Sequence, residues 1–256
     1  MKSYPVLSVH NQPLILSVET ATLGGSVCVT RGDYVLAALT GDLHISHSNR
    51  LLLEVAECLE RADVFLSDVD LFAAASGPGS FTGLRIGIAT VNALAATLGR
   101  PCVGIPTLRA VGRAAGPSSA TIALLPAGRG EMFAQLFSVS PDGSVTEIDA
   151  PAHLSLLGVI DRYGAIPNLR WAGAGAQIQR DLLRDHAQEK GIEFGAEGIA
   201  PTEELRQCWT LAPEILNLGE HVAALSFEQW KRGEVVTPPY LTALYVRPSD
   251  AELKCQ

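Results

Sequence analysis

The sequence lacks the features on which several classes of protein depend. Its 256 residues hold five cysteines, an odd number without a C-x-x-C pair, so we expect neither a disulfide framework nor a zinc cluster. Apolar runs are interrupted before they reach the length of about 18 residues that a membrane span needs. The first 12 residues contain only a short semi-apolar stretch, residues 5–9, which is too short for a signal-peptide core. These observations predict a cytoplasmic protein that has no contact with a membrane.

Familiar catalytic and nucleotide-binding motifs are missing as well. The sequence has no G-K-[ST] of a Walker A loop, no G-x-G-x-x-G dinucleotide unit and no G-x-S-x-G nucleophile elbow. His44 and His47 have a spacing that could bind a metal on a helix, but no third ligand lies nearby, and the other four histidines are isolated. The residues by themselves therefore predict no catalytic group and no metal site.

The composition is that of an ordinary globular protein. Apolar residues make up 47% and charged residues 18% of the chain, which argues against disorder, and the length allows a substantial core. Nineteen Lys and Arg face 27 Asp and Glu, so the formal charge is −8. A net negative protein is a poor electrostatic match for a polyanion, and we expect no tight binding to nucleic acid by this chain alone.

The strongest positive signal is a strand–loop–helix unit at residues 71–98. An apolar run of strand length, 71–76, is followed by the glycine-rich turn GPGSFTG and then by a helical segment in which Arg85 is the only ionised side chain. A helix that is apolar on nearly all sides must be covered on more than one side. One cover is its own sheet, and the other must be a second helix, from this chain or from another one.

The glycine-rich loop itself has two interpretations. A loop that leads into a helix N-terminus offers free N–H groups that can hold an anion. The candidate phosphate-binding residues are Gly77, Gly79, Ser80, Thr82 and Gly83. The alternative, which the residues alone favour, is a tight turn in which Ser80 or Thr82 caps the helix and the glycines allow strand and helix to approach closely. Glu19, at the end of the first strand, could likewise hold a metal near phosphates or only cap a turn.

The order of elements predicts an α/β protein with two lobes. Three strands near the N-terminus form an antiparallel meander, and helix, strand and helix follow. Residues 116–119, Gly-Pro-Ser-Ser, are the best candidate for a lobe boundary. We expect an N-terminal lobe at 1–115, completed by a long helix at 210–232, a smaller second lobe at 118–208, and an irregular tail at 235–256.

A set of motifs in fixed order resembles the TsaB (YeaZ) family. These motifs are ILSVETAT at 15–22, HSNRLLLEV at 47–55, SGPGSFTGLRIGIATVNALA at 76–95, VGIPTLRAVG at 103–112, GRGEMFAQLF at 128–137 and ALYVRPSDAE near the end. The resemblance is strong over residues 14–137 and patchier over 140–235. Glu19 departs from the family, which usually has Asp at this position.

The resemblance implies a two-lobed ASKHA fold, the fold of actin-like ATPases and of ribonuclease H-like proteins, with mixed sheets flanked by helices. It implies a non-catalytic subunit required for N6-threonylcarbamoylation of adenosine 37 in tRNAs that read ANN codons. TsaD would be the transferase, TsaE an ATPase of the assembly, and tRNA would be bound only through the complex. No cofactor is expected to bind firmly to this chain alone. A homodimer, and a nucleotide (ATP or ADP) at the partner boundary, remain open.

The resemblance also bears on catalysis. TsaD carries metal-binding histidines in an H-x-E-G-H segment, and Thr107 and Val111 stand at the corresponding positions here. Neither side chain is a serviceable ligand for iron or zinc, which need imidazole or carboxylate. Arg109, where the family often has Glu, would repel a cation further. This loss supports a non-catalytic role and argues against a metallo-glycoprotease.

Pairing is expected through two helices, 48–62 and 82–98. In this hypothesis the apolar residues of the first helix face the small-residue surface of the second in a helical bundle with the partner. The predicted interface residues are Leu52, Val55, Leu59, Arg85, Ile88, Ala89 and Asn92. The alternative is that Leu52, Val55 and Leu59 pack only inside their own lobe.

Two other functions remain as alternatives. One is an independent ASKHA-type kinase or ATPase, in which Glu19, Thr20, Thr22 and the loop 77–83 would handle phosphates and Mg²⁺. The other is a self-associating regulator or peptidase-like protein. Calorimetry with Mg-ATP separates the first alternative from a non-catalytic subunit.

Overall fold

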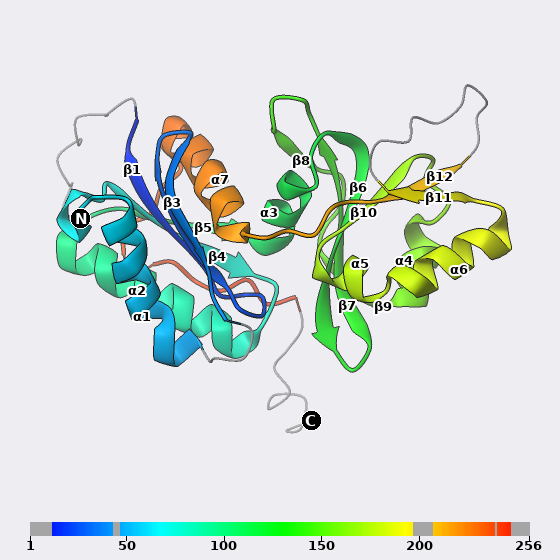
Figure 1. Ribbon diagram of the computed structural model, residues 1–256, viewed down its shortest axis with the longest axis horizontal. Coiled ribbons are helices and arrows are strands. Elements are labelled where there is room, and N and C mark those ends of the chain that lie inside the picture. Colours follow the sequence, from blue (N-terminus) through cyan, green and yellow to red (C-terminus); the bar gives the residue numbers. More distant parts are fainter. Residues whose placement is uncertain (1–11, 43–46, 197–206, 239, 247–256) are drawn as a thin grey trace.

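The computed structural model describes residues 12–42, 47–196, 207–238 and 240–246. They form two sheets, each flanked by helices, that lie side by side along the molecule (Figure 1). Both sheets mix parallel and antiparallel pairs. The α/β class and the two mixed sheets flanked by helices agree with the prediction from the sequence.

The first lobe is built on a five-stranded sheet of order β3-β2-β1-β4-β5. Its strands are β1 (Leu14–Glu19), β2 (Ser26–Arg31), β3 (Tyr34–Thr40), β4 (Leu71–Gly77) and β5 (Cys102–Pro106). The first three form the predicted antiparallel meander, and β4 runs parallel to β1 and β5. Strands β1 and β4 are buried along their whole length because helices cover both faces of the sheet.

Among the residues that the structure describes, four helices and one short 3-10 turn belong to this lobe. They are α1 (His47–Arg61), η1 (Leu66–Asp68), α2 (Phe81–Leu98), α3 (Thr107–Ala114) and α7 (Leu218–Arg232). Alternate residues of β1 show the two faces: Leu14, Leu16 and Val18 share a core with α1 and α2, whereas Ile15 belongs to the core under α3 and α7. This alternation follows from the period of two along a strand.

The second lobe is built on a sheet of order β11-β12-β10-β6-β7-β8, with β9 paired to β7. Its strands are β6 (Ser118–Gly128), β7 (Glu131–Val139), β8 (Val145–Glu147), β9 (Ala152–Ser155), β10 (Leu169–Ala172), β11 (Glu193–Ala196) and β12 (Cys208–Leu211). The helices α4 (Leu156–Tyr163), α5 (Ala174–Ile178) and α6 (Arg180–Lys190) cover one face, over a core that holds Trp171 and Trp209.

The two lobes share one apolar core across α3. Ala110 and Val111 on this helix belong to the same buried cluster as Ile15 of the first sheet and Phe137 of the second. The approach is close, since a Cβ at Gly112 would lie 3.2 Å from the Phe137 ring. The lobes are therefore packed against each other through a helix rather than separated by an open hinge.

Strand β9 pairs with β7, and the Ser155 hydroxyl then caps α4. Helices α5 and α6 are divided at Gln179. The one helix predicted in this part of the chain differs from the structure. The expected helix at 210–232 is first a strand, β12, then a connection over 212–217, and then α7, which starts where the Asn217 side chain accepts from Glu220 N.

Helix α2 is the longest apolar helix among the described residues. Its 18 residues and mean hydropathy of 1.3 would suffice, by length and composition, to cross a membrane. Such a helix is weak evidence of a span, because the core helix of a globular protein passes the same test. Here Leu84, Ile88, Val91 and Ala95 are buried in the first lobe.

Candidate functional site

The loop between β4 and α2 is closed by its own neighbours. Ser80 Oγ accepts a hydrogen bond from Gly83 N at 3.2 Å and thereby caps α2. Ser80 N in turn donates to Ala21 O, in the turn after β1, at 2.7 Å. Of the two predicted caps, Ser80 is confirmed, and Thr82 lies exposed one residue into the helix.

The glycines of this unit let α2 lie against the turn after β1. A Cβ at Gly79 would lie 2.5 Å from Ala21 O, one at Gly83 would lie 1.9 Å from Thr20 O, and one at Gly87 would lie 2.2 Å from Thr20 Oγ1. Thr20 Oγ1 donates to Gly83 O at 2.7 Å across this contact. The packing accounts for these glycines without an anion, and phosphate binding by the loop remains a prediction.

Gly77, at the end of β4, meets a different segment. Its φ of +113° is a conformation that L side chains rarely adopt, and a Cβ there would lie 2.4 Å from Leu244 O. Its N–H donates to Thr107 Oγ1 at 3.1 Å. The carboxyl end of β4 is thus covered by α3 and by the C-terminal segment of the chain.

Glu19 is buried, with 1% of its surface exposed, and serves the turn after β1. One carboxylate oxygen accepts from Thr22 N at 2.8 Å and the other from Thr22 Oγ1 at 2.7 Å. No group of three or more His, Cys, Asp or Glu gathers as a metal site within the part of the chain that the structure describes. The predicted His44 lies outside the described residues, and of His47 only the backbone is described.

Thr107 and Val111, which the resemblance in sequence places where TsaD has histidines, lie inside the molecule. Thr107 is buried and receives the hydrogen bond from Gly77, and Val111 packs in the core between the lobes. Arg109 Nη2 donates to Val145 O at 3.4 Å, and Arg113, one turn later, donates to Gly143 O. Both arginines therefore hold the turn between β7 and β8 against α3.

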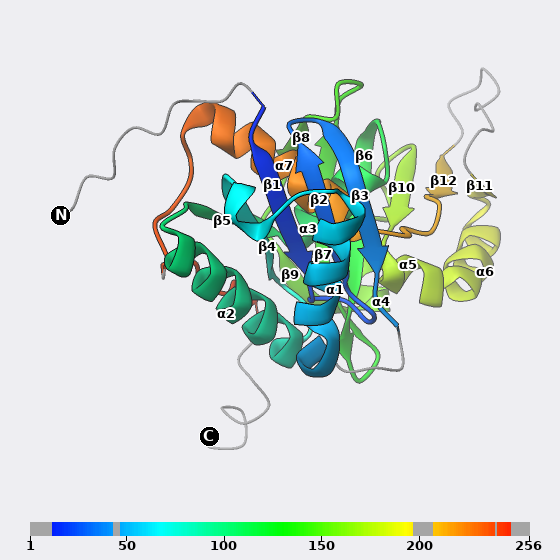
Figure 2. The same cartoon turned by 60° about the vertical axis from the view of Figure 1, so that its left-hand side comes forward.

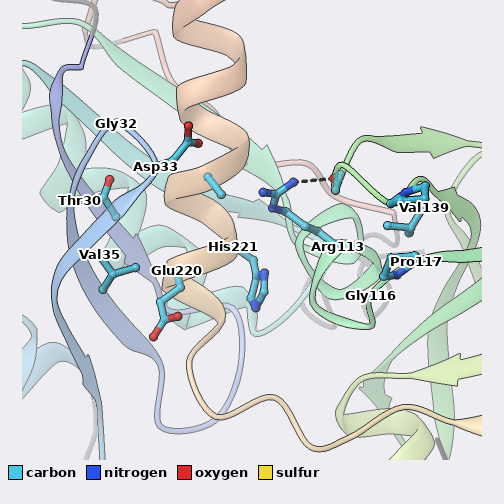
Figure 3. Close-up of a pocket in the computed structure, with 13 residues that line it drawn as sticks. Thr30, Gly32, Asp33, Val35, Arg113, Gly116, Pro117, Val139, Glu220 and His221 are labelled. Atoms are coloured by element: carbon cyan, nitrogen blue, oxygen red, sulfur yellow. Dashed lines mark hydrogen bonds between the residues drawn. The ribbon is translucent and has the colours of Figure 1, made fainter. Parts of the chain in front are cut away.

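A pocket of about 300 Å³ lies at the lobe boundary beside Arg113 (Figure 3). The β2–β3 hairpin, α7 and the β7–β8 turn form its walls. Arg113 also pairs with Glu228 at 3.1 Å, so its charge is already compensated. Burial, with a smaller contribution from Arg113, lowers the pKa of His221 to about 4, so this imidazole is neutral at pH 7. Sequence analysis missed these residues because distant segments supply them and none belongs to a motif.

The predicted interface residues fall on two sides of the first lobe. Val55, with 4% of its surface exposed, and Leu59 and Ile88 are buried in the core beneath α1 and α2. For Val55 and Leu59 the alternative interpretation, packing inside their own lobe, describes the structure, and Ile88 packs in the same core. Asn92 is partly buried and donates to Leu241 O at 2.9 Å. With at most 7% of their surface exposed, Val55, Leu59 and Ile88 offer little area to a partner.

The remaining predicted residues form an outward surface. Leu52 is 64% exposed and its neighbour Leu53 67%; Arg85 and Ala89 are exposed on α2. Ala93 and Ala96 continue the exposed side of α2 at helical spacing. Figure 2 shows α1 and α2 next to each other on the outer side of the first sheet. We refer to Leu52, Leu53, Arg85, Ala89, Ala93 and Ala96 as the outer face.

Comparison with known proteins finds similarity to proteins of tRNA threonylcarbamoyladenosine biosynthesis. Residues 42–155 match the family model described as TsaD: tRNA N6-adenosine threonylcarbamoyltransferase. The tRNA threonylcarbamoyladenosine biosynthesis protein TsaB of Escherichia coli is 32% identical over 122 residues, 46% of this chain and 52% of that protein. TsaB of Bacillus subtilis is 28% identical over 187 residues, 70% of this chain and 78% of that protein. The chain thus spans about half the length of several curated relatives that it matches.

Solved structures agree on the fold. YeaZ from Pseudomonas aeruginosa superposes with a TM-score of 0.68 at 24% identity, over 91% of this chain and 99% of that one. Component A of the (R)-2-hydroxyglutaryl-CoA dehydratase of Acidaminococcus fermentans gives a TM-score of 0.51 at 9% identity, over 86% of this chain and 99% of that one. The two-lobed ASKHA fold expected from the sequence is confirmed.

Proposed function

From the premise that this chain belongs to the TsaB (YeaZ) family, we propose that it is a non-catalytic subunit in the N6-threonylcarbamoylation of adenosine 37 in tRNAs that read ANN codons. A TsaD-type protein is the transferase in this proposal, and a TsaE-type ATPase joins the assembly. The tRNA is bound through the complex, which is consistent with the net charge of −8 on this chain.

The observation that carries the proposal is the outer face of α1 and α2. Leu52 and Leu53 are largely exposed leucines, and exposed alanines lie along the neighbouring helix. Small side chains allow a helix of another protein to approach closely, and the leucines supply the apolar area that association buries. A helix pair that places apolar residues in solvent is typical of a protein–protein contact.

The proposal that the subunit is non-catalytic is supported by the packing roles of Thr107, Val111 and the glycine-rich loop. Thr107 and Val111, which stand where TsaD has histidines, serve the packing of α3. The glycine-rich loop is occupied by contacts with Thr20 and Ala21. The kinase or ATPase alternative needs this loop to bind phosphates, and contacts that already fill the loop do not favour it. A nucleotide, ATP or ADP, bound only at the partner boundary, and a homodimer that uses the outer face, remain compatible with the proposal.

The test combines binding and modification. The purified chain is mixed with the TsaD-type protein of the same organism, and Kd is measured by calorimetry; threonylcarbamoylation of tRNA is then followed with and without the chain. We expect a complex and modification that depends on this chain. Mg-ATP titrated into the chain alone is expected to give no turnover. Absence of a complex, or modification that proceeds equally well without this chain, would refute the proposal.

A matched pair of variants locates the contact. Leu52→Glu places a charge on the outer face and should weaken the complex at least about 10-fold. Leu182→Glu changes an equally accessible leucine, 59% exposed, on α6 of the second lobe and should bind like the parent. Equal weakening by both variants would contradict a contact through α1 and α2.

A further inference from the structure

The first turns of α2 carry an arginine that is held in place by two aromatic residues. The Arg85 guanidinium carbon lies 3.8 Å from the centroid of the Phe81 ring. Phe81 and Tyr245 have ring centroids 5.2 Å apart, and Arg85 Nε lies 3.4 Å from the Tyr245 hydroxyl. Such a cation–π arrangement fixes a long side chain at an exposed site. We refer to Phe81, Arg85 and Tyr245 as the arginine cluster.

The C-terminal segment delivers Tyr245 to this place by a chain of specific contacts. Val236 exchanges two backbone hydrogen bonds with Cys102, at 2.8 and 2.9 Å. Leu241 is buried, and its carbonyl accepts from Asn92. Leu244 N then donates to Ser76 O at 2.7 Å, at the end of β4. Four hydrogen bonds hold residues 236–238 and 240–246, and they place the Tyr245 ring although Tyr245 lies in no helix or strand.

The charge of Arg85 has no acidic counterpart among the residues that the structure describes. The ion pairs described there use other cations, such as Arg100, Arg113 and Arg162. The hydrogen bond to Tyr245 is long, and it engages one nitrogen of a guanidinium that can donate five N–H groups. An exposed, preorganised guanidinium of this kind is suited to a carboxylate, which it can bind through two parallel hydrogen bonds.

We infer that the arginine cluster is a binding hot spot for an acidic side chain of the TsaD-type partner, so that the C-terminal segment contributes to the interface. The inference rests on the proposed function and deepens it. Arg85 and Ala89 are one turn apart on the same exposed side of α2, so the cluster is continuous with the outer face. Arginine and tyrosine are the residue types that most often dominate binding energy at interfaces.

The first experiment measures Kd and association rates for the full chain and the TsaD-type protein at several salt concentrations. Arg85→Glu is expected to weaken the complex about 30-fold and to reduce the salt dependence of the association rate. Arg85→Met, which keeps an apolar side chain over the Phe81 ring, should weaken it about 10-fold. The control Arg184→Glu reverses the charge of another exposed arginine, on α6, and should bind within about 2-fold of the parent.

The second experiment identifies the acidic group. Exposed Asp and Glu residues of the partner are changed to Lys one at a time and titrated against Arg85→Glu. One such change should restore at least about 10-fold of the lost affinity while weakening the parent complex, as expected for a direct charge pair.

A third variant tests the role of the C-terminal segment. Tyr245→Ala removes the ring that orders the arginine and should weaken the complex about 5-fold, whereas Tyr245→Phe retains most of the affinity because the ring contact with Phe81 is kept. Circular dichroism melting curves check that each variant is folded. If the parent binds and folded Arg85→Glu binds equally tightly, the inference is wrong and the proposed function stands. If the parent itself does not bind, the proposed function fails. If Arg85→Glu alters only self-association, the site belongs to a second copy of this chain, and the inference is again wrong.

Discussion

The two sides of α2 differ in whether other segments of the same chain cover them. On the inner side, Leu84, Ile88 and Val91 are buried, and Gly83 and Gly87 lock onto Thr20 in the turn after β1. On the outer side, Ala89 and Ala93 are exposed, and so are the leucines at 52 and 53 of α1, the helix in contact with α2. The sequence of the helix is almost uniformly apolar, so hydrophobicity does not indicate which side is buried. The buried side is the one whose glycines fit against the turn after β1.

This difference explains why the glycine-rich loop is an ambiguous signal. The spacing of its glycines also suits a phosphate cradle, but two of them, Gly79 and Gly83, approach backbone atoms of residues 20 and 21, as Gly87 in the following helix approaches the Thr20 side chain. A glycine can mark a ligand or a neighbouring segment of the same chain, and only the tertiary contact tells which. The sequence alone leaves both interpretations open for the same residues.

The largest expected effect separates the two sides of α1. Val55→Asp places a carboxylate in the core beneath α1 and α2 and should lower the free energy of unfolding by about 4 kcal/mol. Leu52→Asp, three residues earlier on the exposed side, should change it by less than about 0.5 kcal/mol. Urea denaturation of both variants measures the difference. Similar losses in the two would show that the inner and outer sides are not distinct.

The pH dependence of stability tests whether the boundary between the lobes excludes water as the inner side of α2 does. His221 has a pKa of about 4 in the folded protein against 6.5 as its ordinary value. Above pH 6.5 the imidazole is neutral in both states. As the pH falls toward 4, the unfolded chain gains a proton that the folded chain does not, so stability should fall by about 3 kcal/mol in total and level off below pH 4.

The matching variant for this titration is His221→Gln, which keeps a polar side chain and removes the titration. Urea denaturation at pH 7, 6, 5 and 4 should show a shallower decline for the variant than for the parent. If stability falls equally with pH in the variant and the parent, His221 takes up its proton alike in the folded and unfolded chain. Its imidazole would then be accessible to solvent in the folded protein.

A smaller effect is expected where α2 meets Thr20. Gly87→Ala places a methyl group 2.2 Å from Thr20 Oγ1 and should cost about 2 kcal/mol, since the threonine must move and lose its hydrogen bond to Gly83. Thr20→Ala should cost about 1 kcal/mol by itself. The double variant should cost less than the sum, because removing Oγ1 relieves the clash. Additive costs would indicate that the two residues do not interact.

The smallest effect on stability is expected on the outer side of the same helix. Ala93→Glu adds a charge to an exposed position, where it should alter the free energy of unfolding by less than about 0.5 kcal/mol. The same substitution should weaken the complex with the TsaD-type partner at least about 5-fold, measured by calorimetry. Loss of stability in the isolated chain would show that this side of α2 is covered within the monomer.

Local features could be predicted from the sequence, and long-range contacts could not. The meander, the strand–loop–helix unit and the Ser80 cap depend on spacings within a few residues, and all are present. Periodicity placed Val55 and Leu59 on an apolar side of α1, but Leu52 and Leu53 make that side too broad to identify which part faces the core. The division of 210–232 depends on pairing between β10 and β12, which no local pattern reveals.

The candidate site was predictable to a similar degree. Arg85 and Ala89 are candidates because they lie on a conspicuous helix, and their role at an interface stays a prediction. Tyr245, 160 residues from Arg85, was not a candidate, because nothing in an irregular C-terminal segment indicates which element it contacts. The same is true of Arg113, whose partners at Gly143 and Glu228 lie 30 and 115 residues away.

The participation of the C-terminal segment in the first lobe has a consequence for biosynthesis. The first sheet begins at residue 14, yet one of its faces is covered by α7, and the end of β4 is covered by Leu244. The second sheet, in contrast, draws all of its strands from residues 118–211. During translation we therefore expect the lobe that starts first to close last, after residue 246 has left the ribosome, with the outer face of α2 ordered only then.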